Sequence, residues 1–532
     1  MRPNGIGSCG SRSSIRPFKT DVMIENDPNN NPIFQPQTSA NKKLRQDVAP
    51  PDWVNPEPAD KYNLVVIGAG SGGLVTAAGA AGLGAKVALI ERNALGGDCL
   101  NVGCVPSKAL LSAAKRAAAV RVASGYGVSL PGGSEVDFSA VMERMRELRA
   151  SIGPNDSAER FKELGIDVFL GEGRFKNEAT IEVDGKELKF AKAVIATGGR
   201  AIVLPIPGLK EAGALTNETL FSLTELPRRF AVIGAGPIGC EMAQAFARLG
   251  SEVTLFEAQC KILPREDANA AKVVEAALER DGVRMVCDAK IEQVGREGDL
   301  RTIRIEHEGA TQTWEFDQIL VGVGRAPNVE GIGLENADVE FDKRKGVSVD
   351  AQLRTSNPKI FAVGDVAMDY KFTHMADATA RIVIQNALFK GRKKHTDLLV
   401  PWCTYTQPEI AHVGLYEQEA KAQHGGALQT FRQDFAEIDR SILEGGTEGF
   451  VKMHTVKGKI VGATIVGEHA GDLISEISVA MQAGMKLGSL ASVIHPYPTT
   501  AEAIRRLGDA YNRTRFTPLV AKLFAKWLQW SR

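Results

Sequence analysis

The sequence predicts an α/β fold, because one strand–glycine–helix–strand pattern occurs in it twice. The pattern fills residues 63–92 and returns over residues 229–258. Strands that alternate with helices in this way form parallel sheets covered by helices. From about Val400 the pattern changes to a mixed segment of strands and helices. The expected architecture is therefore two Rossmann-like domains and a C-terminal α+β domain.

The first unit has the features that a dinucleotide site requires. The apolar run Leu64 to Ile67 suits a buried parallel strand, and the glycines after it have GxGxxG spacing. They allow a tight turn, close approach of the backbone to a pyrophosphate, and close packing of helix on strand. The helix N-terminus offers free N–H groups to an anion, and the acid ending the second strand can accept from a ribose hydroxyl. The residues expected to bind this nucleotide are Gly68, Gly70, Gly73 and Glu91.

The second unit repeats each of these features. Its expected nucleotide-binding residues are Gly234, Gly236, Gly239 and Glu257. Since both units have strand, glycines, helix, second strand and terminal acid in the same order, two nucleotides are expected to bind one chain.

Two cysteines follow the first unit in GGDCLNVGCVPSK, residues 96–108. Cys99 and Cys104 are too far apart for the usual paired zinc ligands, and the sequence has no second CxxC or Cys/His cluster. A disulfide that closes so short a loop adds little stability. The spacing favours a dithiol that opens and closes during a reaction; the alternative is two buried cysteines without chemistry.

The composition argues against other classes of protein. The 64 basic residues balance 64 acidic ones, so there is no electrostatic case for binding nucleic acid. No run of about 18 apolar residues occurs, so no membrane-spanning helix is expected. A cysteine pair suited to redox cycling fits a reducing interior, and a cytoplasmic location is expected.

Taken in order, these motifs resemble the flavin-dependent pyridine nucleotide–disulfide oxidoreductases, which include dihydrolipoamide dehydrogenase, glutathione reductase and mercuric reductase. The resemblance runs from about Lys61 to Tyr511. It implies that the first unit binds FAD, that the second binds NADH or NADPH, and that Cys99–Cys104 is the redox-active disulfide. Cys99 would be the outer sulfur that faces the electron acceptor, and Cys104 would contact the flavin. The family is also homodimeric through its C-terminal domain.

The resemblance extends to three further segments. Residues 191–208 would close the flavin site and lead into the nicotinamide domain, and residues 321–328 would mark the return. Residues 360–366 would deliver an aspartate to the ribityl and phosphate region of FAD. The expected FAD-binding residues in these segments are Thr197, Gly198, Gly364 and Asp365.

The family also places a glutamate, here Glu241, against the lysine of the PSK segment, Lys108. An ion pair is expected beside the flavin, where a cation would stabilise negative charge on the reduced ring; the alternative is a solvated glutamate. Asp98 departs from the family, which commonly has an uncharged residue there. Unless its charge is offset, Asp98 should raise the pKa of the Cys99 thiol.

Glu257 bears on the choice of nicotinamide nucleotide. An acid at this place accepts from a 2′-hydroxyl and repels a 2′-phosphate, which favours NADH. Lys261 and Arg265, just beyond it, keep NADPH as the alternative.

The acceptor prediction depends on residues 495–502, HPYPTTAE. Aligned on the family's His-Pro-Thr motif with Glu502 as its glutamate, the segment has Tyr497 where disulfide-handling members have their histidine. A phenol with a pKa of about 10 is a poor general base beside an imidazole at about 6.5. A tyrosine here is similar to mercuric reductases, so Hg(II) is the expected acceptor, bound transiently as substrate by Cys99 and Cys104.

The similarity to mercuric reductases has limits. The sequence ends KWLQWSR, without their vicinal cysteine pair, and has no N-terminal CxxC. Cys403 is the unassigned thiol of the C-terminal part; it either substitutes for that pair or is structural. The alternative acceptor is lipoamide, as in dihydrolipoamide dehydrogenase, which Glu257 favours and Tyr497 opposes.

The C-terminal residues 513–532 predict an amphipathic, basic helix. It would lie on a membrane surface, as in a membrane-associated, quinone-directed redox module, or pack within the dimer. Its apolar and basic residues are Leu519, Val520, Leu523, Phe524, Trp527 and Leu528, with Lys522, Lys526 and Arg532 between and after them.

The expected domains follow from these assignments. Residues 1–59, rich in Asn, Pro, Ser and charge, are expected to be a disordered, dispensable tail. The remaining boundaries are 60–200 and 326–397 for the FAD domain, 201–325 for the NAD(P) domain, 398–512 for the dimerisation domain and 513–532 for the terminal helix.

Overall fold

The computed structural model describes residues 31–129, 135–288, 290–307 and 309–532, and its first domain is built on a seven-stranded sheet. Five strands run parallel to one another, and two at one edge are added by antiparallel hairpins. In sheet order the strands are β3 (Asp167–Leu170), β2 (Val87–Glu91), β1 (Tyr62–Ile67), β6 (Lys186–Ile195), β5 (Thr180–Val183) and β4 (Arg174–Asn177), with β18 (Ile360–Ala362) also on β6.

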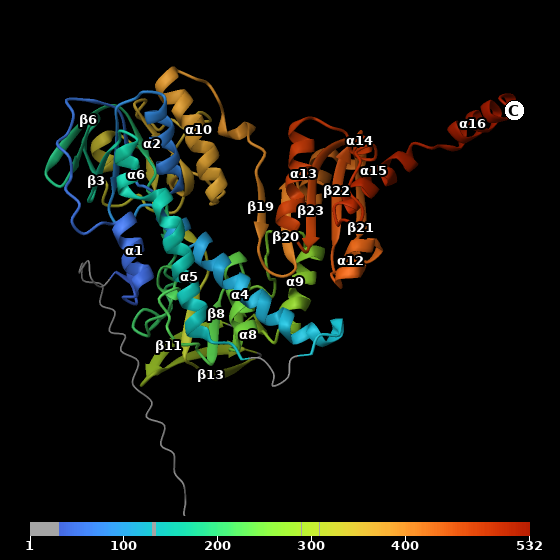
Figure 1. The fold of residues 1–532 in the computed structure, drawn as a ribbon, viewed down its shortest axis with the longest axis horizontal. Helices are drawn as coiled ribbons and strands as arrows, with labels where there is room; N and C mark the ends of the chain where they lie inside the picture. Colours follow the sequence, from blue (N-terminus) through green and yellow to red (C-terminus); the bar gives the residue numbers. More distant parts are fainter. Residues whose placement is uncertain (1–30, 130–134, 289, 308) are drawn as a thin grey trace, which may run out of the picture.

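Two helices from distant parts of the sequence cover one face of this sheet. Helix α2 (Ser71–Gly82) follows the first glycine motif, and α10 (Thr373–Phe389) packs against it (Figure 1). The residues of α2 are mostly Gly and Ala, so the two backbones come close together. This contact brings the segment around residue 364 next to the first glycine motif.

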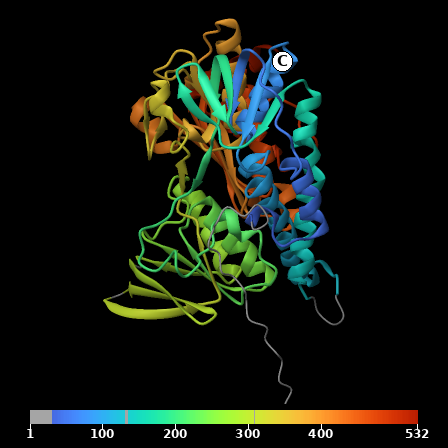
Figure 2. The ribbon, with the colours of Figure 1, turned by 90° about the vertical axis from the view of Figure 1, so that its left-hand side faces the viewer.

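The second domain has a parallel four-stranded sheet, as the repeated motif predicted. Figure 2 shows its three antiparallel strands at the end of the domain away from the first sheet. The parallel strands are β10 (Arg284–Cys287), β9 (Glu252–Glu257), β8 (Arg229–Ile233) and β14 (Gln318–Val321), with helices α8 (Pro237–Leu249) and α9 (Ala268–Arg280) and the antiparallel strands β11 (Lys290–Glu297), β12 (Leu300–His307) and β13 (Ala310–Phe316).

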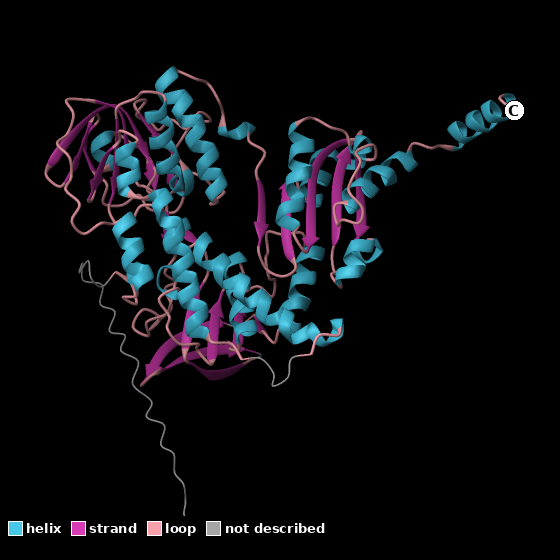
Figure 3. Cartoon of the chain, in the orientation of Figure 1, coloured by secondary structure: helices cyan, strands magenta, loops and turns pink. Residues whose placement is uncertain are grey.

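The C-terminal domain is a five-stranded antiparallel sheet with helices beside it (Figure 3). Its strands, in sheet order, are β19 (Pro401–Thr404), β20 (Glu409–Gly414), β23 (Lys459–Gly467), β22 (Phe450–Val456) and β21 (Leu428–Asp434), and its longer helices are α13 (Ala470–Gln482) and α15 (Glu502–Thr514). The predicted fold class, two Rossmann-like domains and a C-terminal α+β domain, is confirmed.

Helix α4 (Cys104–Val122) links the first two domains. It starts at the second cysteine of the dithiol and packs against both α5 (Phe138–Ile152) and α8 of the second domain. Because α4 begins at Cys104, the dithiol lies where the first domain meets the second.

The prediction that residues 1–59 form a disordered tail is wrong for residues 31–59; residues 1–30 lie outside the described part. Helix α1 (Ser39–Val48) packs against α5, and Leu44 and Val48 on it are fully buried. Apolar residues four positions apart mark a helical face, a pattern that the polar composition of the segment hid.

The C-terminal segment contains α16 (Pro518–Trp530), which extends away from the rest of the structure (Figure 1). The predicted helix 513–532 is thus divided, because α15 ends at Thr514 and α16 starts after Thr517 caps it. Among the described helices, none has both the length and the apolar character to cross a membrane.

Candidate active site

The first glycine motif forms a turn that has no space for side chains. Gly68 has φ +101°, and a Cβ there would lie 2.4 Å from the carbonyl oxygen of Ala196. A Cβ on Gly73 would lie 1.8 Å from the oxygen of Gly68. Helix α2 starts after Gly70 without a side-chain cap, so its first N–H groups remain available to an anion. This geometry fits the pyrophosphate of FAD.

Glu91, at the end of β2, is held from both sides by backbone N–H groups. Its Oε2 accepts from Ala69 at 2.7 Å and its Oε1 from Asn93 at 2.8 Å. Burial raises its pKa. Each carboxylate oxygen can accept more than one hydrogen bond, so Glu91 can still accept from a ribose hydroxyl.

The second glycine motif repeats these contacts. Gly234 also has φ +101°, and a Cβ on Gly239 would lie 1.9 Å from the Gly234 oxygen. Glu257 accepts from the backbone of Ala235 at 2.9 Å and of Gln259 at 3.1 Å. Helix α8 starts after Gly236, again without a side-chain cap. The two units therefore have equivalent hydrogen bonds as well as the same sequence pattern. This geometry fits a second dinucleotide.

The dithiol loop packs on the first glycine motif, backbone against backbone. Gly96 donates its N–H to the oxygen of Ala69 at 2.9 Å, and a Cβ on Gly97 would lie 2.6 Å from the Cα of Gly70. The glycine pair before Cys99 is thus required for this contact, which holds the dithiol beside the nucleotide loop.

Cys99 and Cys104 are free thiols in this structure and lie against each other. Cys99 belongs to the short helix α3 (Gly97–Asn101), and Gly103 makes the tight turn into α4, where a Cβ would meet the oxygen of Asp98 at 2.8 Å. The turn brings two sulfurs from successive helices together, as a dithiol that cycles requires.

The two thiols differ in acidity. A hydrogen bond from Cys99 lowers the pKa of Cys104 to about 6, with help from Thr373 Oγ1 at 3.3 Å and the charge of Lys108. The same contact with Cys104, together with burial, raises the pKa of Cys99. At neutral pH Cys104 is therefore the thiolate, and Cys99 remains a protonated thiol.

The expected ion pair between Lys108 and Glu241 is present, with Nζ 2.9 Å from Oε2. Glu241 is 4% exposed, and its other oxygen accepts from the backbone N–H of Tyr405 at 2.9 Å. The Lys108 ammonium also lies 4.6 Å from the centre of the Tyr405 ring. Three side chains, one from each domain, thus meet near Cys104.

Asp98 forms an ion pair with Arg325, which also lies 3.3 Å from Asp365. The charge of Asp98 is therefore offset, and the condition for its expected effect on Cys99 is not met. Burial raises the pKa of Asp365, and Arg325 opposes that effect. Arg325 joins the dithiol loop to the segment expected to reach the ribityl chain.

Thr197 and Gly198 lie at the crossing between the domains. Thr197 donates to the oxygen of Asn328 at 2.7 Å, and Asn328 donates its backbone N–H to Gly198 at 3.0 Å. Next to them, β7 (Gly199–Ala201) pairs with β15 (Arg325–Pro327). Gly364, with φ +69°, turns the chain before Asp365.

Tyr497 and Glu502 lie in the C-terminal domain. Tyr497 is 74% exposed and donates to Asp439 at 2.8 Å, which raises its pKa. Glu502 accepts from Arg505 and Arg506 on its own helix. Within the described residues of one chain, these contacts do not join either side chain to the dithiol.

Cys403 is a half-buried thiol beside Glu409 at 3.9 Å, and burial raises its pKa. A thiol with a raised pKa is a weak ligand and nucleophile, which favours the structural alternative for Cys403.

Sequence reasoning missed three residues of this site: Thr373, Tyr405 and Arg325. Arg325 lies in residues 321–328, which the sequence indicates only as the return to the flavin domain, and Tyr405 lies in the mixed segment that begins near Val400. Thr373 begins α10 and has no motif of its own, so only folding brings it to the dithiol.

Comparisons with known proteins agree with this geometry. A family model described as pyridine nucleotide-disulphide oxidoreductase matches residues 62–380, and one described as its dimerisation domain matches residues 400–507. A mercuric reductase of Bacillus cereus is 32% identical over 491 residues, which cover 92% of this chain and 78% of that protein. A dihydrolipoyl dehydrogenase of Bacillus subtilis (strain 168) is 34% identical over 467 residues, which cover 84% of this chain and 97% of that protein.

A solved structure is also similar. The HOCl-induced flavoprotein disulfide reductase RclA from Escherichia coli superimposes with a TM-score of 0.75 at 29% identity, covering 84% of this chain and 99% of that one.

Proposed function

This chain belongs to the pyridine nucleotide-disulphide oxidoreductase family, and from that premise we propose that it reduces Hg(II) with electrons from NADH. Its cofactors are FAD and a nicotinamide nucleotide, as in the rest of the family. In the net reaction NADH and Hg(II) give NAD⁺, Hg(0) and one proton. The mercuric reductases among its relatives support this choice of acceptor.

The observation that carries the proposal is the environment of Tyr497. Its phenol donates to the Asp439 carboxylate, and this hydrogen bond raises its pKa above an already high value. A group that keeps its proton at neutral pH cannot act as the general base that reduction of a disulfide substrate needs. Reduction of a soft metal ion needs no such base, because thiolates bind the ion directly.

The chain's own residues supply binding and charge. The N-terminus of α2 and Glu91 would hold FAD, and Glu257 with the N-terminus of α8 would hold NADH. Bound FAD supplies the two-electron step between nicotinamide and dithiol. Lys108, kept in place by Glu241, supplies a positive charge beside the thiolate of Cys104.

Cys99 and Cys104 would bind Hg(II) as a pair. Cys104 is already a thiolate, and Cys99 would lose its proton when the ion binds, because a bound cation stabilises the thiolate form. Hg(II) held by two thiolates is neutral, so it adds no uncompensated charge to the site.

We further propose that the enzyme is a cytoplasmic homodimer and that Tyr497 and Glu502 serve the dithiol of the partner subunit. The dimerisation-domain match supports the dimer. The exposure of Tyr497 in the single chain supports its role at a subunit interface.

The test is a steady-state screen of the purified holoenzyme with NADH and NADPH against Hg(II), lipoamide, glutathione disulfide and quinones. We expect Hg(II)-dependent oxidation of NADH, which Cys99→Ser abolishes. Absence of Hg(II)-dependent oxidation would show the proposal to be wrong. Brisk turnover of lipoamide would instead favour a dihydrolipoamide dehydrogenase, the second candidate, to which relatives at 34% identity also point.

A membrane-surface role is supported by α16. No residue of this helix is buried, and it exposes Leu519, Leu523, Phe524, Trp527, Leu528 and Trp530. Residues 513–532 contain five basic side chains and no acidic one, so an anionic lipid surface complements both the apolar face and the charge.

Vesicle sedimentation tests this role. Full-length enzyme is expected to sediment with vesicles containing phosphatidylserine and to be released by high salt, and a variant ending at Arg515 should stay in solution with its activity intact. Trp527→Ser should weaken binding, and Gln529→Ser serves as the control. Binding that persists after the truncation would contradict the role.

A further inference from the structure

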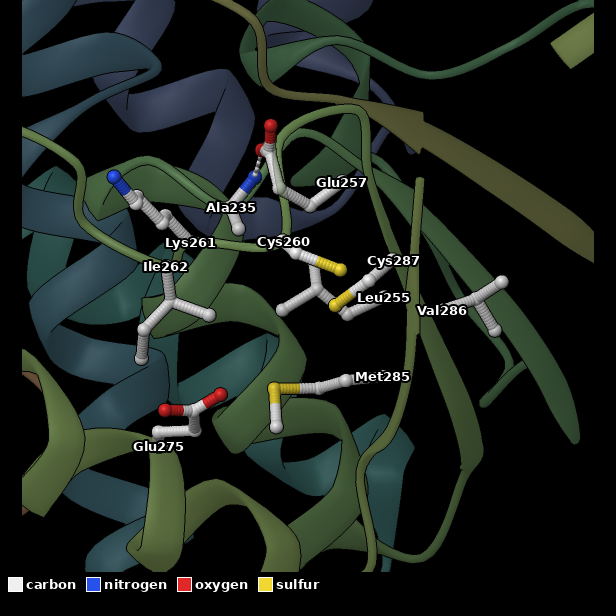
Figure 4. Close-up of a pocket in the computed structure, with 10 residues that line it drawn as sticks. All are labelled: Ala235, Leu255, Glu257, Cys260, Lys261, Ile262, Glu275, Met285, Val286 and Cys287. Atoms are coloured by element: carbon white, nitrogen blue, oxygen red, sulfur yellow. Dashed lines mark hydrogen bonds between the residues drawn. The ribbon is translucent and has the colours of Figure 1, made fainter. Parts of the chain in front are cut away.

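Two cysteines that the active site does not use face each other in the second domain. Cys287 ends β10, and Cys260 lies in the turn after β9. Figure 4 shows their sulfur atoms side by side, although the residues are 27 positions apart in the sequence. The nearby Cys287 thiol raises the pKa of Cys260 to about 12, in agreement with this arrangement.

The space around them suits a single ion. The two thiols line a cavity of about 10 Å³ together with the thioether of Met285 (Figure 4). A cavity of this volume has space for about one water-sized particle. Three sulfur side chains at one cavity are a soft ligand set.

The backbone holds the two thiols in register. Cys287 lies opposite Glu257 in the parallel pairing of β10 with β9. The turn that follows Glu257 is tied back to it, because the N–H of Gln259 donates to Glu257 at 3.1 Å. Cys260, the next residue, has φ +36°, which is uncommon for a residue with a side chain. The turn therefore presents the Cys260 sulfur to Cys287 through a defined conformation.

We propose that Cys260 and Cys287 bind one soft, thiophilic metal ion, of the class of Hg(II) and Cu(I), as a two-thiolate site. Binding releases one proton from each thiol, and no electrons are transferred. Among the described residues no group of three or more His, Cys, Asp or Glu is placed to hold a metal ion, so the proposed site is two-coordinate, through the two thiolates alone. The site lies beside Glu257, which is expected to bind the nucleotide ribose. It does not depend on which acceptor the active-site dithiol reduces.

The test uses the FAD-bound enzyme with Cys9→Ser, Cys99→Ser and Cys104→Ser, which removes the active-site dithiol and the N-terminal thiol. The reduced protein is mixed with HgCl₂ and excess glutathione, desalted, and analysed for mercury by mass spectrometry. Glutathione removes an ion held by one thiol, but two thiols on one chain retain it because the second bond is intramolecular. We expect about one Hg(II) per chain and the ultraviolet absorption of a mercury–thiolate complex.

Adding Cys260→Ser or Cys287→Ser to this background should each abolish retention. Adding Cys403→Ser should leave it unchanged, which makes it the matched control. The flavin spectrum of each variant reports that the protein is folded. Retention that survives Cys260→Ser would overturn the proposal, as would a failure of the background protein to retain mercury. Recovery of the two cysteines as a disulfide after full reduction and incubation with HgCl₂ would overturn it as well.

Discussion

Cys99 and Cys104 belong to one loop but differ in ionisation. Cys104 begins a helix, receives hydrogen bonds from Cys99 and Thr373, and lies near the charge of Lys108. Cys99 donates to this thiolate and lies on the other side of the turn. The family resemblance implies an outer Cys99 and an inner Cys104, and this assignment stays a prediction, which the low pKa of Cys104 favours.

The first prediction concerns the pH dependence of this thiolate. Since the pKa of Cys104 is lowered to about 6, the reduced enzyme should keep its thiolate down to about pH 6 and lose it only below. Thr373→Val removes one hydrogen bond to the thiolate, so the pKa should rise toward the ordinary thiol value, with about a tenfold smaller thiolate fraction near pH 6. Thiolate absorbance measured across the pH range tests this. An unchanged titration in Thr373→Val would show that the contact is irrelevant.

The second prediction concerns Glu241. Glu241→Gln keeps an acceptor for the N–H of Tyr405 but removes the negative charge that holds Lys108. We expect flavin reduction by NADH to slow about 10- to 100-fold, because a positioned charge at the reacting ring is lost. Stopped-flow absorbance measures this rate. Glu468→Gln, which disturbs the ion pair of Lys115 further along α4, is the control and should have little effect.

At the scale of elements, the N-terminal segment supports the dithiol loop. Arg149 on α5 is buried and donates to the backbone oxygens of Asn101 and Ile33 and to the side chain of Asn41. One guanidinium therefore joins α5, α1 and the end of α3, the helix that carries Cys99. Residues 31–48 are thus part of the active-site support, although they precede the first motif.

The third prediction follows from this support. Arg149→Met leaves three buried acceptors without a donor, at about 1 to 3 kcal/mol each, so the free energy of unfolding should fall by several kcal/mol. Deletion of residues 1–48 should likewise destabilise the protein and slow reduction of the dithiol. Thermal unfolding and dithiol reduction rates measure both effects. Deletion of residues 1–30 alone is the matched control; equal stability of the two deletions would contradict the role of α1.

At the scale of the whole molecule, the dithiol and Tyr497 lie in different parts of one chain. The dithiol lies where the first and second domains meet, whereas Tyr497 is exposed on the C-terminal domain. In a twofold dimer, each site would combine the dithiol of one chain with Tyr497 of the partner.

The fourth prediction tests this division by mixing subunits. Cys99→Ser chains lack a sulfur that binds Hg(II), and Tyr497→Phe chains lack the hydroxyl proposed to serve the partner's dithiol, so each is expected to have little Hg(II) reductase activity alone. The two kinds of chain are unfolded together and refolded. If the site is shared, random pairing should restore about a quarter of the wild-type sites, because half of the dimers have one intact site of two. If dithiol and tyrosine act within one chain, the mixture should stay inactive.

The sequence alone determined the fold class, both nucleotide motifs and the dithiol, whereas the Lys108–Glu241 pair followed only from the family resemblance. The nucleotide motifs are readable because steric limits act locally: a turn with φ +101° at Gly68 and a Cβ clash at Gly73 admit glycine alone. The helical spacing of apolar residues also predicted the C-terminal helix. The polar composition of residues 1–59, by contrast, concealed α1.

Only the tertiary structure decided which residues meet across long stretches of chain. Arg325 neutralises the charge of Asp98, although the two residues are 227 positions apart in the sequence. Thr373 contacts Cys104, which is 269 positions before it. Cys260 and Cys287 become a pair because adjacent parallel strands end at the same edge of a sheet. Such contacts depend on packing between elements, which no local pattern encodes, and so a charge or thiol that is isolated in the sequence acquires its partner only in the fold.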